Sequence, residues 1–154
     1  MIAKRAFDLT AASAGILVTS PAMAVIAILV KRSSPGPVLF TQERVGRDGK
    51  TFMIHKFRTM SADATGPAVS PADDARITPL GAVLRRTKLD ELPQLFDVVT
   101  GSMSLVGPRP EVPEYVAQWP SDLRPAILSV RPGITDPASI ALRNEADRLA
   151  EADD

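Results

Sequence analysis

The chain has 154 residues, equal numbers of acidic and basic side chains, no cysteine and one histidine. This length allows a single domain with an appended segment, and the composition excludes disulfides, thiolate zinc sites and most multi-histidine metal sites. Aromatic residues make up only 5% of the chain and basic residues form no run beyond pairs, so nucleic-acid binding is not expected.

The stretch over residues 9–30 carries no charge. At roughly 1.5 Å per residue it is long enough to cross a hydrocarbon core of about 30 Å. Basic pairs flank it, at Lys4-Arg5 and at Lys31-Arg32, and the first 60 residues hold nine basic against three acidic side chains. A basic region beside an apolar stretch suits an anionic membrane surface.

Ser20-Pro21 lies at the middle of this apolar stretch. A proline inside a helix removes a backbone hydrogen bond and costs about 3 kcal/mol unless the helix bends there. Because positive charge prefers the cytoplasmic side, a hairpin broken at Ser20-Pro21 would keep both basic pairs in the cytoplasm. We therefore predict that residues 1–32 form a re-entrant, helix-break-helix membrane segment. A single-pass anchor and a signal peptide, cleaved near Ala22-Met23-Ala24, are the alternatives.

Residues 38–42 and 51–57 are rich in β-branched and aromatic side chains, and the segment between them contains Asp48-Gly49. An Asp-Gly pair between two such runs predicts a short β-hairpin. Residues 61–79 are polar and contain one glycine and several prolines, which is typical of a surface loop.

Residues 80–87 and 89–99 are predicted helices, the second beginning near Asp90 because Pro93 is best tolerated in a first turn. Apolar side chains recur at helical spacing in the second stretch and form one face, consisting of Leu89, Leu92, Leu95, Phe96 and Val99. Its polar side chains fall on the other side and are Asp90, Glu91, Gln94 and Asp97. The fold class is therefore α+β and mainly helical, with amphipathic helices around a small cytoplasmic catalytic domain over residues 33–154.

Asp90 and Glu91 are adjacent carboxylates at the start of this predicted helix. A carboxylate can attack phosphorus and form an acyl phosphate, which splits one transfer into two steps. Mg²⁺ binds through one or two carboxylates together with substrate phosphates, and it neutralises charge that would repel the attacking carboxylate. The pair thus indicates chemistry on a phosphorylated substrate. For the dipeptide taken alone, the solvated start of an amphipathic helix is the alternative.

Three arginines are candidates for binding substrate phosphate. Arg109 lies between two prolines, so its planar guanidinium loses little entropy when it grips a phosphate. Arg85 precedes Asp90 by five residues, and Arg58 follows the second predicted strand, where basic and apolar side chains alternate. Ordinary solvated charges on a turn, a helix and a strand are the alternatives. The single histidine, His55, is expected to be structural.

Several motifs occur in a familiar order over residues 2–145, and they are residues 4–8, 20–21, 36–46, 56–60, 90–95, 103–110 and 131–135. Together they resemble the bacterial sugar transferases, small monotopic phosphoglycosyl transferases that start glycan assembly on polyprenyl phosphate. The resemblance implies transfer of a sugar-1-phosphate from a UDP-sugar to undecaprenyl phosphate, with release of UMP. It places this reaction at the cytoplasmic face of the bacterial inner membrane, as the first membrane step of glycan or exopolysaccharide assembly.

By the same resemblance, Asp90 is the nucleophile of a covalent phosphosugar intermediate and contacts Mg²⁺, and Glu91 is the second member of the dyad. Arg85 and Arg109 match family arginines near substrate phosphate, and Ser20-Pro21 matches the break of the re-entrant helix. Membrane lipid is an expected partner, and downstream glycosyltransferases are further partners that such an enzyme could meet.

The sequence departs from the common family pattern near its end. Asp136 and the residues after it replace the usual Gly, Trp and Gln, and most relatives continue for several dozen residues beyond the point that corresponds to Asp154. The chain is therefore expected to lack the usual C-terminal extension. Two alternatives follow: a catalytically impaired relative that acts as a membrane or partner-binding scaffold, and a Mg²⁺-dependent phosphohydrolase in which water replaces the lipid acceptor.

Overall fold

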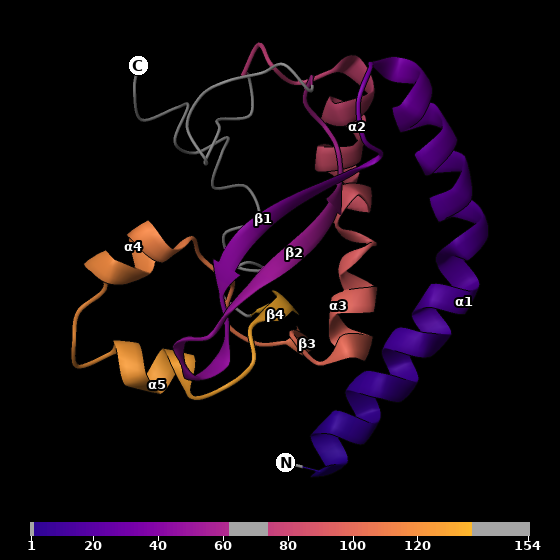
Figure 1. The fold of residues 1–154 in the computed structure, drawn as a ribbon. Coiled ribbons are helices and arrows are strands. Elements are labelled where there is room, and N and C mark those ends of the chain that lie inside the picture. The colour runs from indigo at the N-terminus through magenta and orange to yellow at the C-terminus, as the bar shows by residue number, and fades with distance from the viewer. Residues whose placement is uncertain (1, 62–73, 137–154) are drawn as a thin grey trace.

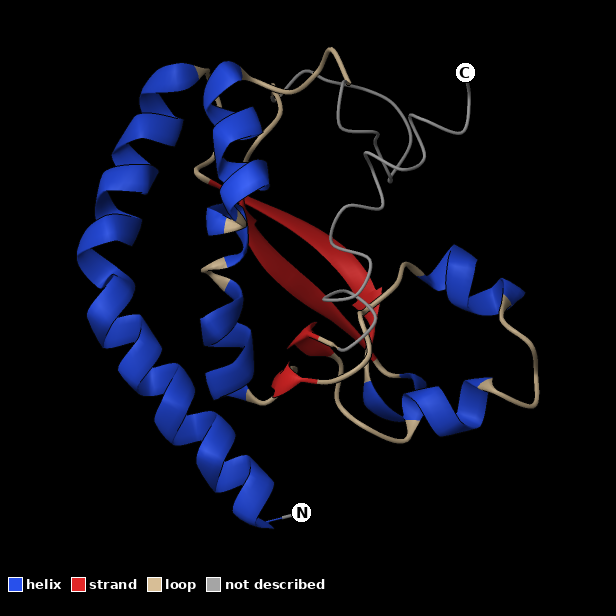
Figure 2. Cartoon of the chain, turned by 180° about the vertical axis from the view of Figure 1, so that it is seen from behind, coloured by secondary structure: helices blue, strands red, loops and turns tan. Residues whose placement is uncertain are grey.

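The computed structural model describes residues 2–61 and 74–136. These residues form a long N-terminal helix, a β-hairpin beside it, and short helices and strands around the hairpin (Figures 1 and 2). The helices are α1 (Ile2–Ser33), α2 (Pro79–Thr87), α3 (Gln94–Thr100), α4 (Pro113–Gln118) and α5 (Arg124–Leu128), with single 3-10 turns at Arg47–Gly49 and Leu89–Glu91. The strands are β1 (Leu39–Val45), β2 (Thr51–Phe57), β3 (Ser104–Val106) and β4 (Gly133–Thr135). Most of the predicted surface loop and all of the last 18 residues lie outside the described residues.

α1 runs without interruption through Ser20-Pro21, where the sequence predicted a break between two arms. Figure 1 shows it as one bowed helix. Pro21 has no N–H to offer the carbonyl of Leu17 four residues earlier, but the hydroxyl of Ser20 donates a hydrogen bond to that carbonyl at 3.0 Å. A side-chain donor thus replaces the missing backbone donor, as serine does beside prolines in membrane helices. This compensation explains how the helix can continue past the proline.

Both ends of α1 are attached to the rest of the fold. Near its start, the buried Asp8 accepts hydrogen bonds from the hydroxyl of Ser104 at 2.9 Å and from Lys4 at 2.7 Å. Near its end, the last turn packs into a buried apolar cluster that includes Val30 and Phe57. Between these points α1 lies along α3, with which it makes its most extensive contact. The helix is therefore anchored to one folded body along its whole length.

The β-hairpin forms where the sequence predicted it. β2 has the predicted bounds, and β1 pairs with it antiparallel from Leu39 opposite Phe57 to Val45 opposite Thr51. Asp48 and Gly49 have φ angles of 58° and 74°, in the left-handed region that Asp-Gly tolerates best. The turn chemistry explains this agreement between sequence and structure.

The 3-10 turn at Leu89–Glu91 and α3 after it turn much of their polar side inward. Asp90, Gln94 and Asp97 are buried, whereas Leu89 and Phe96, two members of the predicted apolar face, are 37% and 49% exposed. The polar side packs against β2 and pairs with polar side chains there, which lowers the cost of burying it. The remaining apolar members pack toward α1, so α3 lies between the hairpin and the middle of the long helix, while the end of α1 contacts β2 directly.

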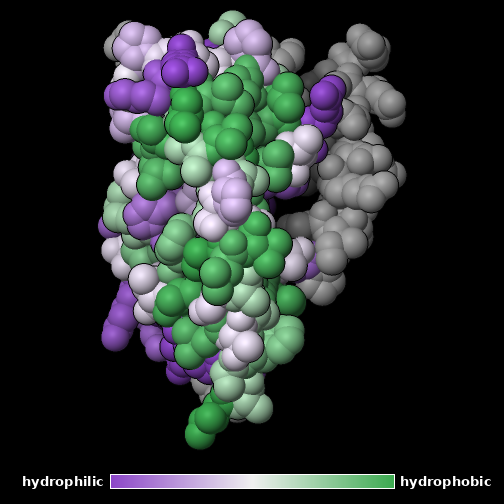
Figure 3. Space-filling model, turned by 90° about the vertical axis from the view of Figure 1, so that its right-hand side faces the viewer, coloured by the Kyte–Doolittle hydropathy of each residue, from purple (hydrophilic) through white to green (hydrophobic). Residues whose placement is uncertain are grey.

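The outer side of α1 is apolar and uncovered. Figure 3 looks onto this side, and hydrophobic side chains run along most of its height. The exposed apolar residues of α1 include Phe7, Leu17, Val18, Val25, Ile28 and Leu29. The helix is long and apolar enough to cross a membrane, and only 17% of its most apolar stretch is buried against the chain. Such a helix needs an apolar surrounding that the described residues do not supply.

Candidate active site

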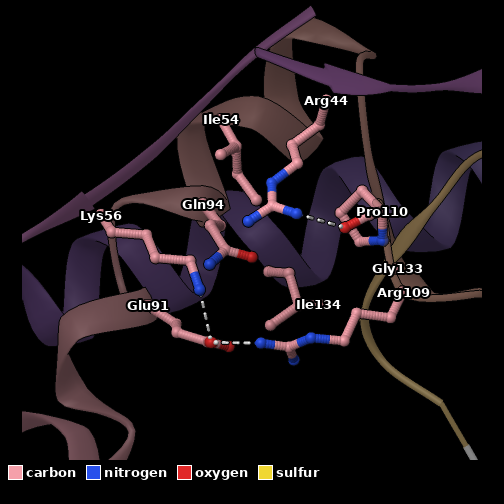
Figure 4. Close-up of a pocket in the computed structure, with 9 residues that line it drawn as sticks. All are labelled: Arg44, Ile54, Lys56, Glu91, Gln94, Arg109, Pro110, Gly133 and Ile134. Atoms are coloured by element: carbon pink, nitrogen blue, oxygen red, sulfur yellow. Dashed lines mark hydrogen bonds and ion pairs between the residues drawn. The ribbon is translucent and has the colours of Figure 1, made fainter. Parts of the chain in front are cut away.

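A small open cleft lies between the hairpin, the start of α3 and the turn that follows β3 (Figure 4). Its lining residues come from five separate segments of the chain. They are Arg44, Ile54, Lys56, Glu91, Gln94, Arg109, Pro110, Gly133 and Ile134.

The hairpin supplies three of these side chains from one of its faces. Arg44 pairs with Phe52 in the register, and Gln42 pairs with Ile54. Because directly paired residues share a face and alternate residues along a strand return to it, Arg44, Ile54 and Lys56 all point to the same side of the hairpin. This side is closed by α3 and by the turn that carries Arg109 (Figure 4).

Arg109 is held by a close backbone approach between two glycines. A Cβ atom on Gly133 would lie 2.1 Å from the backbone nitrogen of Gly107, so neither position has room for a larger residue. The N–H of Gly133 donates to the carbonyl of Pro108 at 3.0 Å, and β3 pairs in parallel with β4 just before the turn. The Gly-Pro-Arg-Pro segment is thus fixed on β4 and presents Arg109 to the cleft.

Glu91 is the anionic centre of the cleft. Its Oε1 lies 2.9 Å from Nζ of Lys56 and 3.4 Å from Nη2 of Arg109. Burial raises the pKa of Glu91, but the positive charges of Lys56 and Arg109 outweigh this effect and hold the pKa below its usual value. Glu91 is therefore ionised and orients both cations.

Asp90 lies in the same 3-10 turn and is only 7% exposed. Its Oδ1 is buried and has no hydrogen-bond partner among the described residues. Burial raises the pKa of Asp90 and the neighbouring Glu91 raises it further, although Lys56 opposes both. A buried carboxylate oxygen without a partner is costly, and such groups concentrate at functional sites.

The cleft is positively charged. Arg44, Lys56 and Arg109 line it, against the single carboxylate of Glu91. Burial lowers the pKa of Arg44, and the charge of Arg109 lowers it further despite the pairing of Arg44 with Glu111. A cleft lined by two guanidinium groups and an ammonium group favours an anion, and arginine matches phosphate with two parallel hydrogen bonds. The geometry suits a phosphate or diphosphate.

The three arginines that the sequence suggested as phosphate ligands lie in different places in the structure. Arg109 lines the cleft, whereas Arg58 is 7% exposed and donates to the carbonyl oxygens of Val30, Ser34 and Pro35 at 3.3, 2.7 and 2.6 Å. Arg58 thus closes the C-terminal end of α1. Arg85 donates from Nε to the hydroxyl of Thr59 at 2.9 Å and is not among the described residues that line the cleft.

His55 has the structural contacts expected of it. Its Nδ1 lies 2.7 Å from Oδ1 of Asp97, and its backbone N–H donates to Oδ2 of the same carboxylate at 3.0 Å. Asp97 therefore occupies the outer edge of β2 and ties it to α3. Arg44 and Gln94 are cleft residues that sequence reasoning did not nominate. The hairpin register and the strand alternation could have identified Arg44, since Lys56 lies on the same face.

The residues present fit a bound Mg²⁺. The described part of the chain holds no group of three or more His, Asp or Glu side chains that could bind a metal by themselves. Mg²⁺ does not require such a group, because it commonly takes one or two carboxylates and completes its shell with substrate phosphates and water. The unpartnered oxygen of Asp90 is a ligand of this kind.

The sequence matches the model of one protein family, described as bacterial sugar transferase, over residues 1–153. It is 45% identical to the UDP-glucose:undecaprenyl-phosphate glucose-1-phosphate transferase of Escherichia coli, over 95% of this chain and 32% of that protein. It is 40% identical to the exopolysaccharide production protein PSS of Rhizobium leguminosarum, over 99% of this chain and 80% of that protein.

A third relative is the UDP-N-acetylgalactosamine-undecaprenyl-phosphate N-acetylgalactosaminephosphotransferase of Aeromonas hydrophila, 41% identical over 94% of this chain and 35% of that protein. The chain thus spans about a third of the length of two of these relatives and most of the length of the other. Since the family match covers nearly every residue, the resemblance inferred from the motifs is confirmed: the chain belongs to the bacterial sugar transferase family, a family of phosphoglycosyl transferases.

Proposed function

We propose that this protein transfers a sugar-1-phosphate from a UDP-sugar to undecaprenyl phosphate and releases UMP. The single observation that carries this proposal is the buried, unpartnered oxygen of Asp90 beside a cleft lined by three cations. Such a carboxylate is poised to react with phosphorus, and the cations compensate the charge of a diphosphate. The names of the relatives supply the UDP-sugar donor and the undecaprenyl-phosphate acceptor.

In the first step a carboxylate oxygen of Asp90 attacks the phosphorus that carries the sugar. The bond from that phosphorus to the bridging oxygen breaks, and UMP leaves with the oxygen and its electron pair. In the second step a phosphate oxygen of undecaprenyl phosphate attacks the same phosphorus, and the bond to Asp90 breaks. Asp90 is regenerated, and the product is a lipid-linked diphosphosugar.

The other cleft residues bind and orient. Arg109 and Arg44 hold the diphosphate. Lys56 neutralises charge near Asp90 and partly offsets the rise in the pKa of that carboxyl. Glu91 fixes Lys56 and Arg109 through its two ion pairs. Bound Mg²⁺, held by Asp90 and substrate phosphate, would supply further neutralisation of phosphate charge.

The attachment of α1 at both ends supports a monotopic arrangement at the cytoplasmic face of the bacterial inner membrane. A spanning helix would place its two ends on opposite sides of the bilayer, but Asp8 and Val30 both contact the same folded body. With its exposed apolar side in the lipid, α1 would instead enter the membrane from the side on which the cleft lies. The two basic ends then remain on the side that positive charge prefers.

The test is UMP release by membrane-reconstituted protein with Mg²⁺. The donors are UDP-glucose, UDP-galactose and UDP-N-acetylgalactosamine, each with and without undecaprenyl phosphate. We expect repeated turnover to depend on the lipid, because without it release stops after about one UMP per enzyme. Release of free sugar-1-phosphate without lipid would instead indicate a phosphohydrolase. Lack of release with every donor, from folded and membrane-bound protein, would favour the non-catalytic scaffold.

A further inference from the structure

Gln94 is a buried amide that has no partner. The residue is 2% exposed, its Nε2 is buried without a hydrogen bond, and its side chain makes no hydrogen bond to any residue that the structure describes. It lines the cleft from the first turn of α3, and Figure 4 shows its amide group between the side chains of Lys56 and Arg44. A buried polar group is normally satisfied, so this one calls for a partner that the described residues do not provide.

Packing gives no reason for an amide at this position. The neighbouring cleft residues Ile54 and Ile134 are apolar, and an apolar side chain of similar length would fill the same space without leaving a donor unsatisfied. Gln94 lines the cleft in which the proposed donor substrate would bind, and Figure 4 shows its amide group among the cleft side chains, so the missing partner belongs to that ligand.

The chemistry of the amide indicates which part of the ligand it meets. The cations Arg44, Lys56 and Arg109 already serve the phosphates, which at neutral pH only accept hydrogen bonds. An amide is neutral and both donates and accepts, as do the hydroxyl and acetamido groups of a sugar. The transferred phosphorus carries the sugar directly, so the sugar enters the same cleft as the phosphates.

We propose that Gln94 binds the sugar of the donor and donates a hydrogen bond from Nε2 to a sugar oxygen next to the transferred phosphate. The proposal rests on the proposed function and names a residue that recognises the sugar rather than the nucleotide. A site built to bond a substrate hydroxyl discriminates strongly, because its own buried group is left unpaired by the wrong ligand.

The test replaces Gln94 by methionine, which has the same length but no donor, in the full chain reconstituted in membranes. Binding of UMP and of the three UDP-sugars is measured together with UMP release. For the sugar that the wild type uses, we expect Gln94→Met to weaken UDP-sugar binding and to lower kcat/KM about tenfold or more. Binding of UMP, which has no sugar-1-phosphate, should change less than threefold, and the thermal midpoint should stay the same or rise.

Gln118→Met is the matched control, since Gln118 is an exposed glutamine on α4, outside the cleft. It should leave the binding of UMP, the binding of the UDP-sugars and the thermal midpoint unchanged. Gln94→Leu repeats the test with a second apolar side chain, in case methionine alters folding. An equal loss of UMP and UDP-sugar binding would overturn the proposal in favour of a nucleotide contact. Unchanged binding of both UMP and the UDP-sugar would also overturn it. So would a thermal midpoint low enough for partial unfolding to explain the loss of UDP-sugar binding. A wild type that binds no UDP-sugar would instead overturn the proposed function.

Discussion

At the scale of single residues, the two adjacent carboxylates differ in environment. Glu91 is ion-paired with Lys56 and Arg109, which lower its pKa, whereas Asp90 has an unpartnered buried oxygen and a raised pKa. One carboxylate therefore pairs with the cations, and the other keeps an oxygen without a partner among the described residues. Residues next to each other in sequence acquire these separate roles because only Glu91 reaches the cations of the hairpin and of the turn after β3.

Asp90→Asn should abolish phosphosugar transfer and leave membrane association intact, since the amide cannot act as the nucleophile. The same change should stabilise the protein at neutral pH by about 1 kcal/mol, or roughly 2–6 °C in thermal midpoint. Because the pKa of Asp90 is raised on folding, the folded state binds the proton of this carboxyl more tightly than the unfolded state does. The stability that Asp90 contributes is therefore present at low pH and is lost as the pH rises through its folded pKa.

Thermal unfolding at pH 7 and near pH 4, together with UMP release, checks both parts. The difference in midpoint should shrink at the lower pH, because the raised pKa means that a larger fraction of wild-type Asp90 is protonated there. Full turnover by Asp90→Asn would refute the nucleophile assignment. Loss of membrane binding by the variant would indicate a structural role for Asp90.

At the scale of elements, Arg58 joins α1 to the hairpin. It follows directly after β2, and its guanidinium meets three carbonyl oxygens at the end of α1 and in the segment after it. The last carbonyls of a helix have no intrahelical donors, and a positive charge is also favourable at a helix C-terminus. The arginine that looked like a phosphate ligand in the sequence therefore contributes to the contact between two elements.

Arg58→Met should lower the free energy of unfolding by about 2 kcal/mol, because it removes hydrogen bonds from a buried charged group. The kcat/KM of the folded fraction should stay within threefold of wild type, as measured by UMP release at a temperature well below the midpoint. Arg86→Met is the control, since Arg86 is an exposed arginine on α2 and its loss should cost little. If Arg58→Met kept its midpoint but lost affinity for UDP-sugars, Arg58 would be a substrate ligand.

At the scale of the whole molecule, α1 has two different faces. One face of α1 packs on α3 and the hairpin, and the opposite face exposes large apolar side chains. Since the cleft lies on the folded body to which α1 is attached, insertion of α1 would hold the cleft near the membrane surface. A lipid-linked phosphate at that surface would then be close to Asp90.

The monotopic arrangement predicts that both ends of α1 lie in the cytoplasm. The chain has no cysteine, so single cysteines can be introduced without removing native ones. Ala3→Cys and Pro37→Cys, at exposed positions near the two ends, should both resist a membrane-impermeant maleimide in intact spheroplasts and react after permeabilisation. Labelling of just one of them in intact spheroplasts would demonstrate a spanning helix instead.

Local sequence signals by themselves determined several elements. The Asp-Gly pair predicted the hairpin because left-handed backbone angles are a local property. The spacing of apolar residues located α2 and α3, although α3 begins at Gln94 and the stretch near Asp90 is a 3-10 turn. The motif order was enough to recognise the family. Ser20-Pro21 shows the limit of a local rule, since the penalty of the proline is offset by a hydroxyl on the preceding residue.

Only the tertiary structure decided which side chains meet. It buried Gln94 and Asp97 and exposed Phe96, because α3 packs between the hairpin and a helix whose other side is itself apolar. It also brought Arg44 to the cleft and turned Arg58 away from it. These outcomes depend on contacts between segments far apart in the chain, so the periodicity of one segment cannot predict them. The sequence indicates a phosphosugar chemistry, and the packing determines which residues face the cleft in which we propose that it takes place.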